Sequence, residues 1–347
     1  MGKSEFYNGN RLLTMKDIDG ETPEIFIVDG NRSAGKSFFF KELLVKHFLK
    51  RGEKFIILAR QGNEINGTIE AFFKDIVEVK FPDITYSGEW VCDQLFQKIY
   101  INDKHAGYCI ALNQADKIKK KSTMFVDAAA IFFDEFQTDR YCTDEVNKFI
   151  SIHISIARGG GKHTRYVPVY MCSNHVSILN PYYIVFGIYK RWIPQQYFFM
   201  RGPGWVFEFT FNEEAATKII QTGFGKAVAS STYMQHATQN SSLLDNCNFV
   251  CKVKGDKRIF TVLIRDGKEF GVWNVNDDVL YVSSKTEPNW PFKLTFKTSD
   301  HNVSRILQKK GDYYAKAMRD MFNQGRMRFE SLEAKDAFLD FIGYTLI

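Results

Sequence analysis

Near its amino end the chain reads Gly30-Asn31-Arg32-Ser33-Ala34-Gly35-Lys36-Ser37. This segment matches the pattern G-x-x-x-x-G-K-[ST] at every defined position. The glycines let the backbone wrap around a phosphate, with N–H groups directed inward at the start of a helix. In such loops the lysine pairs with the outer phosphates and the last hydroxyl holds Mg²⁺. We therefore expect this segment to bind a nucleoside triphosphate, with Lys36 on its phosphates and Ser37 as a ligand of Mg²⁺.

The residues on both sides predict the strand and the helix that such a loop requires. Residues 25–30 form an apolar run that ends in a turn residue, which is typical of a buried strand. Apolar residues recur at helical spacing over 37–50, and residues 54–59 form a second apolar run. Further strands are predicted at 96–101 and 107–112, as a hairpin, and at 129–133 and 166–172. This pattern favours an α/β fold with a mainly parallel sheet.

Polar residues follow two of these predicted strands. Asp134 and Glu135 come directly after 129–133, where Asp134 would hold Mg²⁺ and Glu135 would polarise the attacking water. Asn174 follows 166–172 and is expected beside Asp134, where it can sense the third phosphate. Taken alone, these residues could be a strand cap and a simple turn. The phosphate loop upstream favours the catalytic interpretation.

The acid pair indicates an ATPase rather than a GTPase or a small-molecule kinase. A GTPase normally carries N-K-x-D, and Asn147-Lys148-Phe149-Ile150 lacks the acid. ATPases that move a load often form rings, in which a neighbouring subunit supplies a cation to the transition state. Arg158, in a glycine-flanked loop that we expect between two strands, is the candidate for this role. Arg32, inside the phosphate loop, could instead act within its own subunit.

Composition places the chain among ordinary globular proteins. Of its 347 residues, 45% are hydrophobic and 25% are charged, which excludes a disordered chain. No apolar run approaches the roughly 18–20 residues that cross a bilayer, and no signal peptide is evident. We therefore expect a protein without a membrane partner that is cytosolic and soluble or is recruited to a larger assembly. The net charge of +6 permits a nucleic-acid partner without demonstrating one. The 6 cysteines are scattered, so we expect free thiols and no zinc site.

The chain changes character after residue 210. We expect a nucleotide-binding domain at 1–210, a linker or mobile lid at 211–246 and a smaller α+β domain at 247–347. Within the middle segment, residues 221–246 are rich in Ser, Thr, Gly, Asn and Gln, as linkers are. In the last domain strands come first and helices last, with strands predicted at 248–253, 258–265, 269–274 and 279–283 and helices at 302–323 and 331–342.

Several segments together resemble the DNA-packaging ATPases of small phi29-like podophages. They extend over most of the chain and comprise Glu5-Phe6-Tyr7-Asn8, the phosphate loop with arginine at its third position, Phe133-Asp134-Glu135-Phe136, Cys172-Ser173-Asn174-His175-Val176-Ser177, Asn180-Pro181-Tyr182-Tyr183, Thr222-Gly223-Phe224-Gly225-Lys226, Phe270-Gly271-Val272-Trp273 and Met321-Phe322-Asn323-Gln324-Gly325-Arg326-Met327-Arg328-Phe329. The resemblance implies an ASCE-type P-loop NTPase domain, joined by a linker to a ribonuclease-H-like domain that has lost nuclease activity.

The same resemblance implies how such a protein works. It implies ATP and Mg²⁺ as cofactors and a homopentameric ring that threads double-stranded DNA through a portal (connector) into a procapsid. A structural packaging RNA would tether the ring to the portal. The motor would act in the host cytoplasm, transiently at the portal vertex, and would be absent from the mature virion.

The resemblance also assigns individual residues. Lys36, Asp134 and Glu135 keep the roles given above, Arg158 matches the family's trans-acting arginine, and Lys121 matches a second trans-acting basic residue. One departure concerns the basic stretch that follows the family's second strand, because here only Arg60 is basic. The residues that grip DNA therefore stay open, although a few phosphate contacts suffice for a motor that does not read sequence.

The charged residues of the last domain admit two interpretations. A nuclease would need carboxylates that converge on two metals, for which the candidates are Asp245, Asp256, Asp266, Asp277, Asp278 and Asp300. We interpret these as turn residues and expect no nuclease activity. The basic residues are candidates for RNA, DNA or portal contacts, namely Lys252, Lys254, Lys257, Arg258, Lys309, Lys310, Arg326 and Arg328.

An alternative function is a nucleotide-gated DNA- or RNA-binding switch that hydrolyses ATP slowly and moves nothing. Glu135 and Arg158 favour the motor, because a switch needs neither a catalytic glutamate nor a trans-acting arginine.

Overall fold

The structure is a computed structural model that describes residues 6–138, 140–158, 163–177, 180–188, 198–229, 231, 234, 249–309 and 311–344. The chain divides into two compact units, residues 1–244 and 245–347. Each unit has its own sheet and its own hydrophobic core. Within the ranges just given, no helix is both long and apolar enough to cross a membrane.

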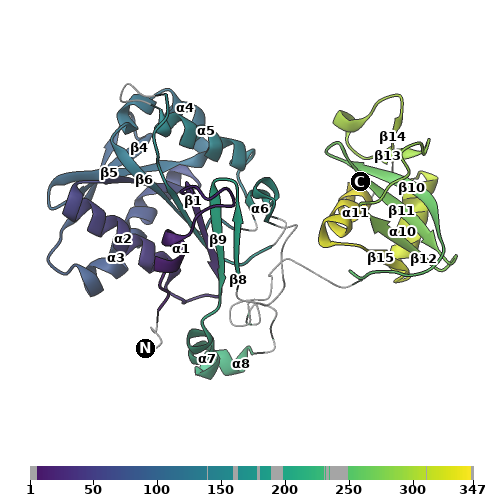
Figure 1. Cartoon of the computed structure of the whole chain (residues 1–347), viewed down its shortest axis with the longest axis horizontal. Helices are drawn as coiled ribbons and strands as arrows, with labels where there is room; N and C mark the ends of the chain where they lie inside the picture. Colours follow the sequence, from purple (N-terminus) through teal and green to yellow (C-terminus); the bar gives the residue numbers. More distant parts are fainter. Residues whose placement is uncertain are drawn as a thin grey trace. The chain divides into compact units, whose positions relative to one another are not determined.

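The first unit is built on a nine-stranded sheet with the order β3-β4-β5-β2-β6-β7-β1-β9-β8. Figure 1 shows this sheet with helices on both sides of it. The strands from β5 to β9 in this order are parallel, whereas β3, β4 and β8 pair antiparallel at the two sides. The strands are β1 Ile25–Gly30, β2 Lys54–Ala59, β3 Tyr86–Val91, β4 Phe96–Ile101, β5 Lys104–Ala111, β6 Ala128–Asp134, β7 Val169–Asn174, β8 Phe198–Gly202 and β9 Trp205–Thr210.

Helices cover both faces of this sheet. Successive residues of β1 point to opposite faces, so that Phe26 and Val28 share a core with α2 and α3 while Ile27 shares one with α5. Burial on both faces explains the continuous apolar runs of the central strands. The helices are α1 Asn10–Thr14, α2 Lys36–Arg51, α3 Ile65–Lys80, α4 Ala115–Lys119, α5 Glu145–Ala157, α6 Pro181–Phe186, α7 Glu213–Gln221 and α8 Gly223–Ala227.

The predicted strands of this unit are largely confirmed. Those at 25–30 and 54–59 are present, and the predicted hairpin is formed by β4 and β5. The strand predicted at 166–172 instead spans Val169–Asn174, because Pro168 has no N–H to donate to the sheet. The prediction that Arg158 lies between two strands is wrong, because the helix α5 precedes it.

The second unit has a six-stranded sheet with the order β14-β13-β10-β11-β12-β15. β10, β11 and β12 are antiparallel, and β13, β14 and β15 add in parallel at the two sides. α10 and α11 pack on the sheet around a common core. This α+β arrangement agrees with the predicted ribonuclease-H-like fold. The elements are β10 Lys257–Arg265, β11 Lys268–Val275, β12 Val279–Ser283, β13 Lys293–Thr295, β14 Arg305–Leu307, β15 Met327–Phe329, α10 Tyr313–Asn323 and α11 Leu332–Tyr344.

Two predictions for this unit are wrong. In the described part of 248–253 only Val250 forms a bridge, so no strand is present there. The helix predicted at 302–323 begins only at Tyr313, and its first half contains the strand β14. The side chain of Asn302 accepts the N–H of Ser304, and such local bonds compete with a helix.

The predicted linker or lid, residues 211–246, contains α7 and α8 in its first part. Asn212 caps α7, because its side-chain oxygen accepts the N–H of Ala215. Residues 230, 232–233 and 235–246 of this prediction, among them Asp245, lie outside the described residues, as do Cys247, Asn248 and Lys310. The boundaries of the linker therefore stay a prediction.

Candidate functional site

The phosphate loop joins the end of β1 to the start of α2. Gly30 ends β1 at a point where a Cβ atom would lie 2.1 Å from the carbonyl oxygen of Thr210 on β9. Gly35 precedes α2 with a φ of +87°, in the left-handed region that favours glycine. Close approach therefore requires the first glycine, and backbone conformation requires the second. The N–H groups at the start of α2 suit an anion.

Lys36, the first residue of α2, is buried beneath this loop. Its Nζ donates to the carbonyl oxygens of Gly30 at 3.2 Å and Asn31 at 2.6 Å, and to Oδ1 of Asn174 at 3.3 Å. Burial lowers the pKa of Lys36 to about 8, and the charge of Asp29 opposes the shift. The ammonium group is thus held by oxygen atoms without full charge, which a phosphate can replace.

Ser37 and Asp134 meet where α2 approaches the end of β6. The Ser37 hydroxyl donates to Oδ1 of Asp134 at 2.6 Å. Burial raises the pKa of Asp134, while the charge of Lys41 and the Ser37 hydroxyl oppose this shift. A hydroxyl and a carboxylate are oxygen ligands of the kind that Mg²⁺ prefers. The chemistry of this pair therefore fits the predicted metal.

A cavity of about 210 Å³ collects the predicted phosphate and catalytic residues, being lined by residues 33–38, Asp134, Glu135, Ser173 and Asn174. Glu135 is exposed and has a φ of +50°, and its N–H donates to Oδ1 of Asp134 at 3.1 Å. A left-handed conformation is uncommon for glutamate and often marks a functional site. The structure thus brings the loop, the acid pair and Asn174 together.

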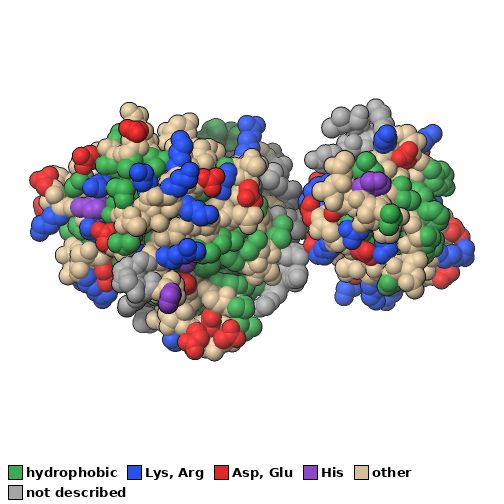
Figure 2. Space-filling model, turned by 90° about the horizontal axis from the view of Figure 1, so that it is seen from above, with side chains coloured by type: hydrophobic (Ala, Val, Ile, Leu, Met, Phe, Trp, Pro, Cys, Tyr) green, Lys and Arg blue, Asp and Glu red, His purple; other side chains and the backbone are tan. Residues whose placement is uncertain are grey.

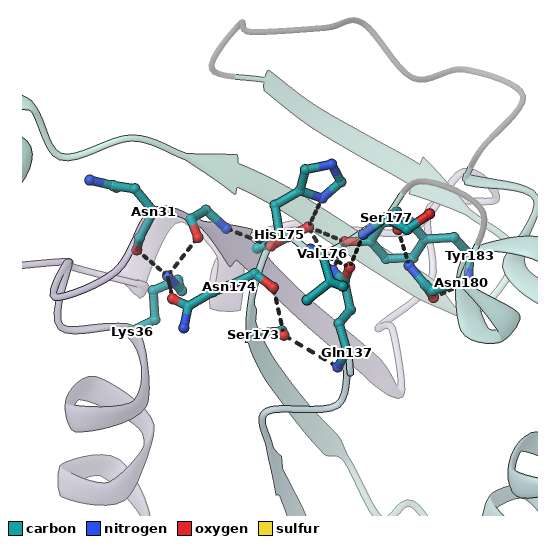
Figure 3. A network of polar contacts seen from close by, with 12 residues as sticks. Asn31, Lys36, Gln137, Ser173, Asn174, His175, Val176, Ser177, Asn180 and Tyr183 are labelled. Atoms are coloured by element: carbon teal, nitrogen blue, oxygen red, sulfur yellow. Dashed lines mark hydrogen bonds and ion pairs between the residues drawn. The ribbon is translucent and has the colours of Figure 1, made fainter. Parts of the chain in front are cut away.

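A buried polar network surrounds Asp29, the residue before the loop. Figure 3 labels its partners Gln137, His175 and Tyr183. Its carboxylate is fully buried and accepts hydrogen bonds from Nε2 of Gln137 at 2.7 Å and from the hydroxyl of Tyr183 at 2.6 Å. Nδ1 of His175 lies 2.8 Å from the same carboxylate. These partners compensate the cost of burying a charged group.

Gln137 extends this network to the segment that follows β7 (Figure 3). The Oε1 atom of Gln137 accepts the backbone N–H groups of Val176 at 3.0 Å and Ser177 at 3.2 Å. The backbone N–H of Gln137 donates to Oγ of Ser173 at 3.2 Å. Gln137 lies two residues after Glu135 in the chain. The network therefore links the backbone after the acid pair to the strand end that carries Asn174.

Arg60 supports the backbone of the acid pair from the other side. Its Nε donates to Oε2 of Glu145 at 3.0 Å, and its Nη2 donates to the carbonyl oxygens of Glu135 at 3.3 Å and Phe136 at 2.9 Å. Only 14% of the Arg60 side chain is exposed. Arg60 is therefore an internal support and not an exposed cation placed for DNA.

The phosphate loop is also joined to α7. Nδ2 of Asn31 donates to the carbonyl oxygen of Asn212 at 3.0 Å, and the N–H of Asn212 donates to Oδ1 of Asn31 at 2.9 Å. Arg32, the next residue of the loop, is exposed. The paired asparagines connect the nucleotide site to the start of the predicted linker or lid.

The two predicted trans-acting residues lie away from this cavity. Arg158 follows the last residue of α5, Lys121 precedes the short helix η3 (Ser122–Phe125), and both are exposed. The phosphate loop lies at the carboxyl ends of the parallel strands, whereas η3 and the end of α5 lie beside Ala128, the first residue of β6. Arg158 and Lys121 are thus at the opposite edge of the sheet from Lys36 of the same chain.

A second cavity, of about 550 Å³, adjoins the phosphate loop and has aromatic walls. The rings of Phe6 and Phe38 stack there with centroids 6.5 Å apart, and Phe6 is 59% exposed. Gly35 and Phe38 line both cavities, so an apolar space is next to the phosphate space. No sequence pattern indicated this cavity, because its walls come from separate segments.

Acidic residues of the second unit are paired with other groups. Asp266 lies 2.6 Å from the Lys297 ammonium, and Asp278 lies 3.2 Å from the Arg326 guanidinium. Asp300 accepts backbone N–H groups at the turn between β10 and β11. Among the residues that the structure describes, no cluster of three His, Cys, Asp or Glu side chains could hold a metal, and the cysteines are free.

The relatives of this chain by sequence and by structure agree with one another. A family model described as Podovirus DNA encapsidation protein (Gp16) matches residues 1–344. The DNA packaging protein of Bacillus phage phi29 is 26% identical over 344 residues, which cover 95% of each chain. That of Bacillus phage B103 is 27% identical over 319 residues, which cover 88% of this chain and 92% of the other. A solved structure of the bacteriophage Phi-29 viral genome packaging motor assembly shares the fold, with a TM-score of 0.72 and 23% identity over 99% of this chain and 100% of that chain.

Proposed function

The chain belongs to the family of podovirus DNA encapsidation proteins, and on this premise we propose that it is an ATP-hydrolysing motor that moves double-stranded DNA into a phage procapsid. The observation that carries the proposal is the cavity in which the phosphate loop, Asp134, Glu135 and Asn174 meet. The family supports DNA as the load, and the cavity supports ATP as the energy source.

In this proposal each residue of the cavity has one role. Lys36 and the loop N–H groups bind the phosphates, and Ser37 and Asp134 hold Mg²⁺, which neutralises phosphate charge when bound. Glu135 accepts a proton from the attacking water. Asn174 contacts the outer phosphate once Lys36 has exchanged its protein partners for phosphate oxygens.

The aromatic cavity supports a place for the base of ATP. It adjoins the phosphate space through Gly35 and Phe38, and the rings of Phe6 and Phe38 offer flat apolar faces on which a base can stack.

A ring would supply the cations that complete the site. Arg158 and Lys121 lie at the sheet edge opposite the phosphate loop, which supports action on another subunit. Head-to-tail contacts that close into a ring place one edge of a subunit against a different edge of the next. We propose a homopentamer in which Arg158 is the principal trans-acting residue. Arg32 is the alternative, acting within its own subunit.

The proposed partners follow the family. They are double-stranded DNA, the portal (connector) of the procapsid and a structural packaging RNA, with the motor in the host cytoplasm, transiently at the portal vertex and not in the mature virion. The ion pairs of Asp266 and Asp278 support a second unit without nuclease activity.

Steady-state ATP hydrolysis with and without linear double-stranded DNA tests the proposal. DNA should stimulate turnover, and Glu135→Gln should bind ATP normally but lose turnover by roughly 10²- to 10⁴-fold. Glu78→Gln, at an exposed glutamate of α3, is the matched control and should leave turnover unchanged. Normal hydrolysis by Glu135→Gln would place the catalytic base elsewhere. ATP binding without turnover has two explanations, a subunit that lacks its neighbour's arginine or a nucleotide-gated switch. Repeating the assay at a concentration at which rings assemble separates them, because only the switch would still fail to hydrolyse ATP.

A further inference from the structure

Arg165 lies between α5 and β7 and takes no direct part in the proposed chemistry. Its Nη1 donates to the carbonyl oxygen of Ala128 at 2.5 Å, and its Nη2 donates to those of Phe125 at 3.2 Å and Ile156 at 3.0 Å. Its backbone N–H donates to the carbonyl oxygen of Ala157 at 2.9 Å. One residue therefore joins the end of η3, the start of β6 and the last turn of α5.

The segments that Arg165 joins carry both residues proposed to act on a neighbouring subunit. Arg158 directly follows Ala157, and Lys121 directly precedes η3, which ends at Phe125. α5 also packs against α4 and η3, and Figure 1 shows α4 and α5 next to each other. Arg165 therefore connects the helix that ends before Arg158 to the short helix that begins after Lys121.

The surface around these segments is exposed and basic. Lys117, Lys119, Lys120 and Lys121, in and after α4, are all exposed, as is Arg158. Figure 2 views the first unit from the side on which Figure 1 places α4 and α5, and lysine and arginine side chains gather on this face. Such a surface attracts a polyanion such as the phosphate chain of a nucleotide.

The side chain of Arg165 makes its contacts through two separate nitrogen atoms of a planar guanidinium, Nη1 and Nη2. The described acceptors of its side chain are three backbone carbonyl oxygens, which belong to three different segments. Burial lowers the pKa of this arginine, and Asp127 opposes the shift. The planar guanidinium, whose nitrogen atoms form a rigid fork, can hold several acceptors at fixed positions relative to one another. A lysine ammonium instead donates from a single nitrogen at the end of a flexible side chain. The role of Arg165 is therefore geometric.

We propose that Arg165 is a positioning residue that holds Arg158 and Lys121 as a preformed pair for the ATP of the neighbouring subunit. This inference rests on the proposed function, because it requires that Arg158 act across subunits. It predicts a particular defect. A subunit without the Arg165 fork still binds ATP and still responds to its neighbour, but no longer activates the next subunit.

Rings assembled from two variants of the full-length chain test this proposal. Arg165→Met removes the fork, and Arg165→Lys keeps the charge without the fork. Each variant alone should bind ATP with unchanged affinity and hydrolyse it roughly 10- to 100-fold more slowly, with the larger loss for methionine. Mixing either variant with Lys36→Ala subunits should recover turnover. Roughly a quarter of the interfaces in a randomly mixed ring then join an intact ATP site to an intact cationic edge.

Two further mixtures make the test decisive. Arg158→Ala mixed with Lys36→Ala should also recover turnover, whereas Arg158→Ala mixed with Arg165→Met should not, because neither subunit has an intact cationic edge. Recovery with Arg158→Ala but with neither Arg165 variant would overturn the positioning role and leave the proposed function intact. No recovery in any mixture would contradict action across subunits, and the positioning role with it. Arg165→Lys keeps the comparison decisive if loss of the charged group in Arg165→Met unfolds the protein.

Discussion

Side chains of the phosphate site are arranged to receive negative charge. Lys36 donates to two carbonyl oxygens and to the amide oxygen of Asn174, none of which carries a full charge. Ser37 and Asp134 are already in contact at 2.6 Å. Little rearrangement of the protein is therefore needed for nucleotide to bind, beyond the exchange of these oxygens for phosphate oxygens.

The pKa of Lys36, lowered by burial to about 8, makes ATP binding depend on pH. Phosphate favours the charged lysine, so ATP affinity should fall as the pH rises above about 8, with proton uptake on binding. Calorimetric titration in buffers of different ionisation enthalpy, between about pH 7 and 9.5, measures both quantities. An affinity and a proton uptake that do not change over this range would contradict the account.

Without nucleotide, a rise in pH has the opposite effect on the stability of the protein. Folded Lys36 binds fewer protons than unfolded Lys36 between pH 8 and 10.5, so its contribution to the free energy of unfolding rises across this window. Lys36→Met should remove this trend in urea unfolding of the protein without nucleotide.

The variant Arg60→Ala distinguishes two possible roles of this arginine, support of the acid pair and contact with DNA. Turnover should fall roughly 10- to 100-fold, because the carbonyl groups of Glu135 and Phe136 lose their donor and Glu135 shifts. DNA affinity at fixed salt, measured by fluorescence anisotropy, should not change. Arg51→Ala, at an exposed arginine that ends α2, is the control. Weaker DNA binding with normal turnover would contradict the structural role.

Among the helices and strands, three neighbouring strands deliver the chemistry. β6, β7 and β1 are adjacent and parallel, so the acid pair, Asn174 and the phosphate loop meet at one edge of the sheet. The local sequence predicts these residues of the site, because each apolar run is followed directly by the polar residues that its strand carries. The supporting contacts could not be predicted, because Arg60 and Glu145 are 85 positions apart and Asp29 and Gln137 are 108 apart.

Short elements were the least predictable. β13 and β15 have three residues each and gain their conformation from the neighbouring strands rather than from an apolar pattern. The error at 302–323 has a similar cause, because β14 pairs with β13 where the local sequence favoured a helix.

Gln137→Leu tests the network that links the strand ends. It removes a donor to Asp29 and the acceptor of two backbone N–H groups in a buried region. The free energy of unfolding of the first unit should fall by about 1–3 kcal/mol, measured by urea denaturation. Gln221→Leu, at an exposed position that ends α7, should have little effect. Equal stability of Gln137→Leu and the unchanged protein would show that the network gives no support.

For the molecule as a whole, the two edges of the large sheet differ in chemistry. One edge carries the phosphate loop and the acid pair, and the other carries Arg158 and Lys121. The family resemblance predicted both residues and their trans action. Their position at the edge opposite the phosphate loop could not be predicted. Arg158 was expected between two strands, and the helix α5 instead precedes it.

The substitution Arg158→Ala should therefore impair ATP hydrolysis in the neighbouring subunit. Hydrolysis should fall by roughly 10³-fold with ATP binding unchanged, and the specific activity of the unchanged protein should rise with concentration as rings assemble. Arg32→Ala, measured in parallel, is the comparison. Near-normal turnover by Arg158→Ala together with loss of turnover by Arg32→Ala would assign the completing cation to the phosphate loop of the same subunit.

DNA packaging itself tests the central claim most directly. Procapsids that carry the portal and packaging RNA are incubated with this protein, linear double-stranded DNA and ATP, and the DNA that becomes resistant to nuclease is measured. The account predicts full-length protected DNA with the unchanged protein and none with Glu135→Gln. DNA-stimulated ATP hydrolysis without any protected DNA would contradict it, because the energy of ATP would then not be used to move DNA.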